Sequence, residues 1–139
     1  GKSCRPNRSA HLLRGSCKAY RQQSEMEYYR RVLEALEHYF RGNGWQKKFL
    51  NGGCFWLASI LHQGIDGSVF MINRVEEHCA LYFENGLYDI RGRISAQNFH
   101  PASEREISFM KKNYVPKFDV KKLEEYLVRK ESLPLGESS

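Results

Sequence analysis

The chain has 139 residues, and its formal net charge of +6 arises from 22 basic and 16 acidic side chains. A chain of this length forms one domain with a core large enough to fold without disulfides or metals. Residues 1–25 carry a net charge of +5 and the other 114 residues a net charge of +1. This distribution argues against a nucleic-acid or membrane-surface role for the folded body, so such a role would depend on the first 25 residues.

The first 25 residues differ from the rest of the chain in composition as well as in charge. They contain few large apolar side chains and show no sustained period, so we expect residues 1–25 to form a flexible basic arm. Met26 opens the first strongly patterned segment. We expect the native chain to start there, with the arm a non-native or upstream addition. A single domain is predicted over residues 26–131 and a frayed tail over residues 132–139.

Hydropathy and the cysteines bear on localisation. No apolar run approaches the ~18 residues of a membrane span, and the N-terminus lacks the apolar stretch of a signal peptide. The four cysteines, at positions 4, 17, 54 and 79, have no C-x-x-C spacing and are not required as disulfides in a domain of this size. We expect reduced thiols, a soluble cytoplasmic protein and no membrane partner.

The first predicted element covers residues 26–41. Apolar side chains recur there at steps of three and four residues, with arginines and glutamates between them. This pattern is typical of an amphipathic helix that lies on a core. The stretch Gly42-Asn43-Gly44 tolerates positive φ and ends the helix. Residues 45–50 then lead, as a loop or short turn, into the next helix.

A glycine pair, Gly52 and Gly53, places Cys54 on the first turn of a second predicted helix, which ends near Gly64. Apolar residues recur through this helix at helical spacing, so it should be mostly buried. Unpaired N–H groups and the dipole at a helix N-terminus favour the thiolate, and small glycines let a substrate backbone come close. The cysteine is therefore a candidate nucleophile. The alternative is a buried structural thiol, which packs as a small hydrophobe.

Three short β-like runs follow, at residues 68–73, 78–83 and 87–91. Asn85-Gly86 separates the last two runs, and an Asn-Gly pair in this setting is the strongest short signal for a hairpin. We expect an antiparallel sheet with this hairpin near its centre.

Two helices close the predicted fold. Ser103 and Glu106 have the spacing of a capping box, which begins a short helix to about Lys112. Asp119 is the predicted N-cap of a last helix to about Lys130. The predicted fold class is α+β, with N-terminal helices, including the cysteine-bearing helix, packed on a small antiparallel sheet and followed by C-terminal helices.

A cysteine nucleophile needs a base within hydrogen-bond reach and a polar group that orients the base. His78 is the favoured base because it opens a strand, with Asp89 eleven residues later on the returning strand. Cys79 alternates away from His78 and is expected in the core. The remaining histidines lie in the arm, on predicted helices or in a loop, and are His11, His38, His62 and His100.

A cysteine on a helix N-terminus, a histidine opening a strand and a polar residue on the next strand resemble the papain-like cysteine hydrolase superfamily. The likeness covers roughly residues 45–94 and is closest to the NlpC-type cell-wall peptidases and the transglutaminase-like proteins. It rests on Gly53-Cys54-Phe55-Trp56, on His78 and on Tyr88-Asp89-Ile90. The resemblance implies Cys54 as nucleophile, His78 as general base and then acid, and Asp89 as the group that orients the imidazole. It implies no cofactor and no metal.

The resemblance also implies an oxyanion site beside the nucleophile. Papain has a glutamine six residues before the cysteine, where this chain has Lys48, so the match fails at that position. Gln46 or Asn51 would take this role, alongside the backbone N–H of the cysteine. Gly53 and Trp56 complete the predicted oxyanion and substrate-binding residues.

The turn type of the hairpin decides whether His78 and Asp89 can meet. A two-residue turn at Asn85-Gly86 separates their side chains by four residues along the strand, about 13 Å at ~3.3 Å per residue. A two-residue turn at Glu84-Asn85 sets Asp89 diagonal to His78 and within reach. A bulge at Gly86 puts the two side chains on opposite faces. The alternative role for Asp89 is a strand-end ion pair with Arg91 or Arg93.

The leading hypothesis is a cysteine-dependent hydrolase or acyl transferase that acts on an amide or ester bond of a peptide or protein. The second is a non-catalytic binding or inhibitor module on the same fold, of the kind found in phage or bacterial interaction proteins, with an inert cysteine. A third is nucleic-acid binding through the arm, with steep salt dependence. A zinc site at Cys54, His78 and Asp89 has suitable ligand types but lacks the short paired spacing of structural zinc.

Overall fold

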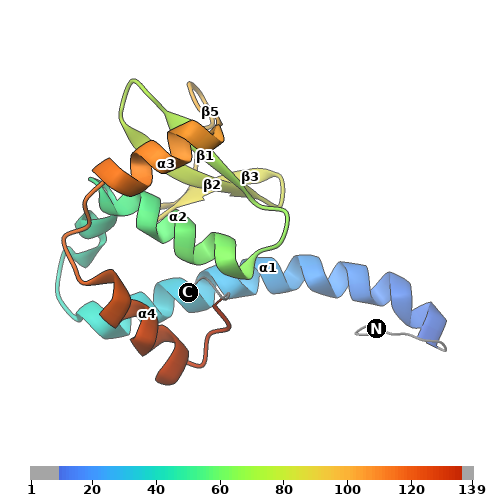
Figure 1. Ribbon diagram of the computed structural model, residues 1–139. Coiled ribbons are helices and arrows are strands. Elements are labelled where there is room, and N and C mark those ends of the chain that lie inside the picture. The colour runs from blue at the N-terminus through green and yellow to red at the C-terminus, as the bar shows by residue number, and fades with distance from the viewer. Residues whose placement is uncertain (1–9, 136–139) are drawn as a thin grey trace.

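The computed structural model describes the backbone of residues 10–135 and the side chains of residues 25–135 (Figure 1). The helices are α1 (Ala10–Phe40), the 3-10 helix η1 (Trp45–Phe49), α2 (Gly53–Gly64), α3 (Glu104–Asn113) and α4 (Val120–Arg129). The strands are β1 (Val69–Asn73), β2 (His78–Phe83), β3 (Gly86–Asp89), β4 (Gly92–Ile94) and β5 (His100–Pro101).

The five strands form one antiparallel sheet in the order β4-β3-β2-β1-β5, with the predicted hairpin β2–β3 beside its centre. The prediction of an α+β fold with helices on a small antiparallel sheet is confirmed. The strands β4 and β5 were not predicted, since they have three and two residues and no alternating run marks them. Pro101 is tolerated because β5 lies at the edge of the sheet.

The core lies between the sheet and α1, with α2 in the middle (Figure 1). Phe55 of α2 stacks on Phe70 of β1 with ring centroids 5.6 Å apart. On the other side of α2, Leu36 of α1 and Leu123 of α4 are fully buried. The mostly apolar α2 is therefore covered by both layers, which holds its N-terminus in a fixed position relative to β2.

Helix α1 begins at Ala10, so the helix predicted to begin at Met26 is longer than expected. The backbone of the predicted flexible arm is helical from residue 10, and residues 1–9 lie outside the described part of the chain. The segment has Gly15 as its only strong helix breaker and is rich in Ala, Leu, Arg and Gln, which favour helix even without an apolar face. The basic side chains proposed for nucleic-acid contact precede the side chains that the structure describes.

The hairpin turn falls at Glu84-Asn85, one of the three turn geometries considered for this sequence. Phe83 pairs with Gly86 and Tyr82 with Leu87, and both turn residues have positive φ, 49° for Glu84 and 59° for Asn85. This geometry is that of a type I′ turn, whose twist suits a hairpin. Gly86, expected in the turn, is instead the first residue of β3.

The C-terminal region agrees with the predicted caps and departs from prediction at its end. Ser103 and Glu106 form the capping box of α3, and the Asp119 side chain accepts from the backbone N–H of Lys122 at the start of α4. Leu133, in the tail predicted to be frayed, is 2% exposed. Its N–H donates to a carbonyl at the end of α4, so an apolar side chain folds back onto the core. Residues 136–139 lie outside the described residues.

None of the helices over residues 10–135 is long and apolar enough to cross a membrane.

Candidate active site

Cys54 is the second residue of α2, and the two glycines before it allow the close packing that holds it there. Gly52, the N-cap residue, has a φ of 81° and supplies no side-chain cap to the first-turn N–H groups. A Cβ on Gly53 would clash with the carbonyl oxygen of Lys48. Cys54 itself is 2% exposed. The thiol therefore lies at an uncapped helix N-terminus, where fixed backbone dipoles favour negative charge.

His78 is the first residue of β2, where a turn over residues 74–77 brings the chain back from β1. It pairs with Asn73, whose side-chain oxygen accepts from the N–H of Glu76 at 3.0 Å and closes the turn. His78 is 6% exposed and its ring meets that of Phe99 edge-on. The imidazole is therefore held in one orientation by the turn, the strand and the aromatic contact.

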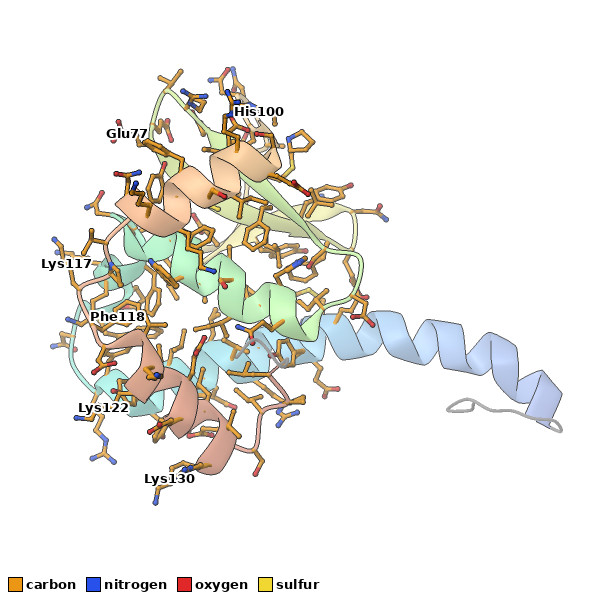
Figure 2. The ribbon with its side chains drawn as sticks, viewed as in Figure 1. Glu77, His100, Lys117, Phe118, Lys122 and Lys130 are labelled. Atoms are coloured by element: carbon orange, nitrogen blue, oxygen red, sulfur yellow. The ribbon has the colours of Figure 1, made fainter. Side chains whose placement is uncertain are left out.

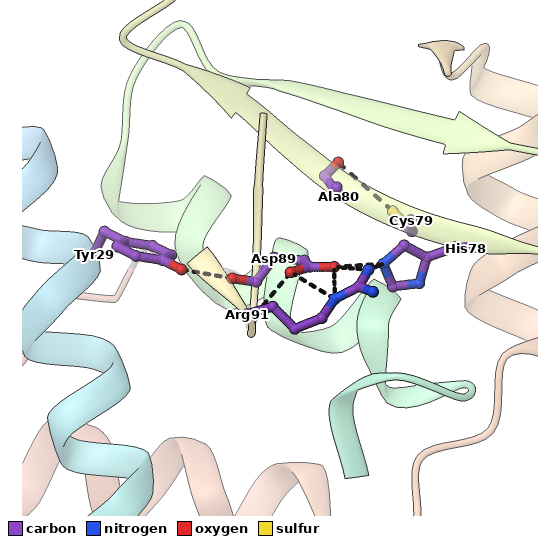
Figure 3. A network of polar contacts seen from close by, with 6 residues as sticks. All are labelled: Tyr29, His78, Cys79, Ala80, Asp89 and Arg91. Atoms are coloured by element: carbon purple, nitrogen blue, oxygen red, sulfur yellow. Dashed lines mark hydrogen bonds and ion pairs between the residues drawn. The ribbon is translucent and has the colours of Figure 1, made fainter. Parts of the chain in front are cut away.

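Asp89, at the end of β3, meets the imidazole of His78 (Figure 3). Its Oδ2 lies 2.8 Å from Nε2 of His78. Leu81 of β2 pairs with Tyr88 of β3, so the next position along the two strands places Asp89 opposite Ala80. This is the arrangement that a turn at Glu84-Asn85 produces. An ionised carboxylate only accepts hydrogen bonds, so Nε2 carries the proton. Nδ1 is then the nitrogen that remains for the thiol.

Arg91 holds the same carboxylate from the turn between β3 and β4 (Figure 3). Its NH2 group donates to Oδ2 of Asp89 at 2.6 Å and its Nε at 3.1 Å. Its backbone N–H donates to Oδ1 at 2.8 Å. The alternative predicted for Asp89, an ion pair with Arg91, is therefore present together with the bond to His78. The two interactions share one carboxylate and fix it between a histidine and an arginine.

Helix α1 holds the main chain at this position. The Tyr29 hydroxyl donates to the carbonyl oxygen of Asp89 at 2.5 Å, in a buried contact. The Tyr29 ring packs against Tyr88 and Phe83 on the neighbouring strands. The main chain of Asp89 is thus held from α1, and its carboxylate is held from the β3–β4 turn and from β2.

The hydrogen bonds and charges of this cluster shift the pKa values of His78 and Asp89. Burial alone lowers the pKa of His78, but hydrogen bonds to Asp89 and to Cys54, together with their charges, outweigh burial and raise this pKa to about 9. Burial alone raises the pKa of Asp89, but hydrogen bonds from His78 and Arg91 lower it below its usual range. At neutral pH the histidine is therefore an imidazolium between a carboxylate and the Cys54 side chain.

The four residues predicted for the oxyanion and substrate site have different positions. Gln46 is exposed on η1 and makes no hydrogen bond to the cluster within the described residues. Asn51 is exposed and lines a pocket at the start of α2. Gly53 is buried as the first residue of α2. The Trp56 ring N–H donates to the carbonyl oxygen of Tyr114 at 2.7 Å, so Trp56 anchors the segment after α3.

Cys79 lies in the core, as its alternation on β2 predicted, with no exposed surface and with its pKa raised by burial. Cys54 and Cys79 are both free thiols. Among the residues that the structure describes, no group of three or more His, Cys, Asp or Glu side chains is arranged to hold a metal ion.

Sequence reasoning did not assign Tyr29 or Tyr114 to the site and considered Arg91 only as a competing partner of Asp89. Tyr114 lies near enough to Cys54 for the thiol's charge to raise its pKa, after burial as the larger cause. Tyr29 belongs to the apolar side chains of the helix predicted over residues 26–41, and that pattern gives it no role beyond packing. These contacts join α1, the β3–β4 turn and the segment after α3, and no local pattern in the sequence marks them.

Residues 32–128 match the model of the phage YunG-like protein family. The chain belongs to this family. The matched range contains Cys54, His78 and Asp89, together with the turn that brings the last two together. Neither the comparison with curated proteins nor the comparison with solved structures gave a match.

Proposed function

We propose that this phage YunG-like protein is a cysteine-dependent acyl-transfer enzyme, a hydrolase or an acyl transferase that acts on an amide or ester bond. One observation carries the proposal. His78 lies close enough to Cys54 for the cysteine to raise its pKa, and its ring bonds the Asp89 carboxylate at 2.8 Å. A nucleophile, a base and a group that orients the base, in that order, form the arrangement that covalent acyl transfer requires.

The reaction begins with the Cys54 thiolate and the His78 imidazolium as an ion pair. The sulfur attacks the carbonyl carbon, and the tetrahedral oxyanion is stabilised by backbone N–H groups at the start of α2, which no side chain caps. The C–N or C–O bond then breaks, and the imidazolium gives its proton to the leaving amine or alcohol. A thioester to Cys54 remains.

Water or an amine completes the reaction. His78, now neutral, takes a proton from the incoming nucleophile, which attacks the thioester carbonyl and releases the sulfur as thiolate. Asp89 keeps the proton of the imidazole on Nε2 throughout, so that Nδ1 faces the reacting atoms. We propose the papain-like cysteine hydrolases as the structural relatives of this site. The free thiols at Cys54 and Cys79 agree with a cytoplasmic setting, which we also propose.

The second candidate is a non-catalytic binding module, and the low exposure of Cys54 favours it. At 2% exposed, the cysteine resembles a core thiol more than an open nucleophile. The segment after α3 lies close to the α2 N-terminus, since a Cβ on Gly52 would meet the carbonyl oxygen of Val115. The two candidates differ in one measurable property, which is the ability of Cys54 to form an acyl-enzyme.

A chromogenic ester tests this property without knowledge of the substrate. With p-nitrophenyl acetate, the Cys54 sulfur displaces p-nitrophenolate and becomes acetylated, and water then releases acetate. We expect a burst of p-nitrophenolate that matches the enzyme concentration, acetylation mapped to Cys54 by mass spectrometry, and a slower steady phase. His78→Ala should lower the burst rate by about 100-fold or more, since general-base catalysis contributes 10²–10⁴-fold.

Cys79→Ala is the matched control, because it removes the other free thiol of the described residues and leaves the cluster intact. It should retain the burst. Acetylation spread over lysines, or a burst unchanged in His78→Ala, would reject the enzyme and support the binding module.

A further inference from the structure

A pocket of about 550 Å³ lies at the start of α2 and at the turn that precedes β2. It is lined by Gly52, two residues before Cys54, and by Glu77, directly before His78. Helix α3 and the segment after it form the opposite wall, through Phe109 and Tyr114. Figure 2 shows Glu77 on the side of the molecule where α3 crosses the sheet. The volume lies within the range of small-ligand sites, about 300–1,000 Å³.

Exposed apolar side chains gather at this pocket. Phe109 is 56% exposed and Val115 is 68% exposed, and both line it. Val75, at 84% exposed, is flanked by two lining residues, and the buried Ile72 adds an apolar surface. Six large apolar side chains are exposed among the described residues, and two of them line this pocket. Apolar surface gathered in this way marks a binding site more often than chance.

The charged residues of the pocket are of both signs. Arg74 and Arg105 lie there with Glu76 and Glu77, and Arg74 is already paired with Glu106 at 3.2 Å. A pocket for nucleic acid or phosphate would have one dominant positive sign. An apolar hollow with a mixed-charge rim instead suits a polypeptide, whose backbone is neutral and whose side chains vary.

Tyr114 lines the pocket and carries a hydroxyl that can serve as a hydrogen-bond donor. Its hydroxyl bonds to no residue that the structure describes, while its carbonyl oxygen is fixed by Trp56. Burial, followed by negative charges that include those of Cys54 and Glu77, raises the pKa of Tyr114 to about 12. The hydroxyl therefore keeps its proton at neutral pH and can donate to a peptide carbonyl.

We propose that this pocket is the substrate-binding site of the enzyme, and that it takes an apolar side chain of an extended polypeptide whose adjacent carbonyl is presented to Cys54. The proposal rests on the proposed function and adds the substrate class to it. Phe109 and Val115 form the apolar contacts, and the Tyr114 hydroxyl orients the peptide backbone.

Tripeptide chloromethyl ketones test the preference directly, since the Cys54 sulfur attacks the methylene carbon and chloride leaves. The two probes carry leucine or aspartate as the residue that bears the chloromethyl ketone. We expect the leucine probe to alkylate Cys54 about tenfold faster or more, as a matched apolar pocket allows. Phe109→Ala should lower the leucine-probe rate at least fivefold and leave the iodoacetamide rate unchanged. Equal rates for the two probes would overturn the proposal.

Val128→Ala is the matched control, because Val128 is a 48% exposed residue of α4 that does not line the pocket. It should leave both probe rates unchanged. If Phe109→Ala behaves like Val128→Ala, Phe109 does not bind substrate and the proposal fails.

A binding measurement separates this proposal from the catalytic one. Cys54→Ala protein is titrated with the corresponding non-reactive tripeptide amides, and the methyl signals of Val115 are followed by NMR. We expect shifts with the leucine peptide and none with the aspartate peptide. If the NMR shifts are selective for the leucine peptide but Cys54 of the native protein does not react, the catalytic proposal fails and the pocket proposal stands. If Cys54 reacts but the NMR shifts show no selectivity, the pocket proposal fails and the catalytic proposal stands.

Discussion

The Asp89 carboxylate and the His78 imidazole lie 2.8 Å apart, although a hairpin turn separates them in the chain. The contact depends on the Glu84-Asn85 turn, because a register shifted by two residues would move Asp89 along the strand beyond reach of the histidine. The turn thus determines whether His78 has a carboxylate partner.

Replacing Asp89 by asparagine tests this partnership. Asp89→Asn removes the negative charge beside Nε2, so the pKa of His78 should fall from about 9 by about one unit or more. NMR titration of the histidine ring proton measures this pKa. An unchanged pKa would mean that the carboxylate does not stabilise the imidazolium.

The stability of the protein should depend on pH through His78. Its pKa is raised from 6.5 to about 9 in the folded state, so the stabilisation is fully present below pH 6.5 and is lost as the pH rises through 9. We expect the difference in unfolding free energy between the native protein and His78→Gln to shrink by on the order of 1–3 kcal/mol across this window. Urea unfolding at several pH values measures it. A difference that grows with pH would contradict the ion pair.

Arg91 should affect the pH at which the protein loses stability in acid. The pKa of the Asp89 carboxyl is lower in the folded protein than in the unfolded chain. The stability that Asp89 contributes is therefore present above its pKa in the unfolded chain and is lost as the pH falls through its pKa in the folded protein. Arg91→Gln removes two of the donors to the carboxylate and should raise the folded pKa, so the loss begins at higher pH. At neutral pH we expect a destabilisation of about 1 kcal/mol.

Arg93→Gln is the control for Arg91→Gln, since Arg93 is exposed and, among the described residues, its side chain hydrogen-bonds only the backbone of Asn85. Its effect on stability should stay within about 0.5 kcal/mol, with no change in the pH at which the protein loses stability in acid. Equal effects of the two substitutions would mean that Arg91 does not stabilise the Asp89 carboxylate.

The hairpin turn offers a stabilising substitution. Glu84 has a φ of 49°, which asparagine adopts more readily than glutamate. Glu84→Asn should therefore raise the free energy of unfolding by about 0.5–1 kcal/mol without shifting the register. Thermal unfolding measures the gain, and an unchanged pKa of His78 confirms the register. A destabilised variant would contradict the assigned turn.

The register is also where sequence reasoning left alternatives that only the structure resolves. The turns at Glu84-Asn85 and Asn85-Gly86 differ by two residues in pairing, so both keep the same side chains on the same face and the apolar pattern cannot separate them. Gly86 is needed in the strand, because a Cβ there would lie 2.9 Å from the ring of Tyr88. That crowding comes from Tyr88 on the same strand and from the Arg93 side chain of β4, and it is not visible in a local Asn-Gly signal.

Other parts of the fold follow from local chemistry. The capping box at Ser103 and the N-cap at Asp119 are complete within four residues, so the sequence predicts both helix starts. The spacing around Cys54 predicts a buried helix for the same reason. The contacts of Arg91, Tyr29 and Tyr114 depend instead on packing between distant elements, for which a single sequence carries no periodic signal.

The central claim is that His78 and Cys54 form a thiolate–imidazolium pair, and the pH dependence of Cys54 alkylation tests it most directly. Iodoacetamide labelling is resolved by site with mass spectrometry, with Cys79 as internal control and His78→Ala in parallel. The ion pair predicts that Cys54 reacts well below pH 8 and that this reactivity disappears in His78→Ala. A silent Cys54, or one with the profile of an ordinary thiol of pKa about 8.5 in both proteins, would contradict the claim.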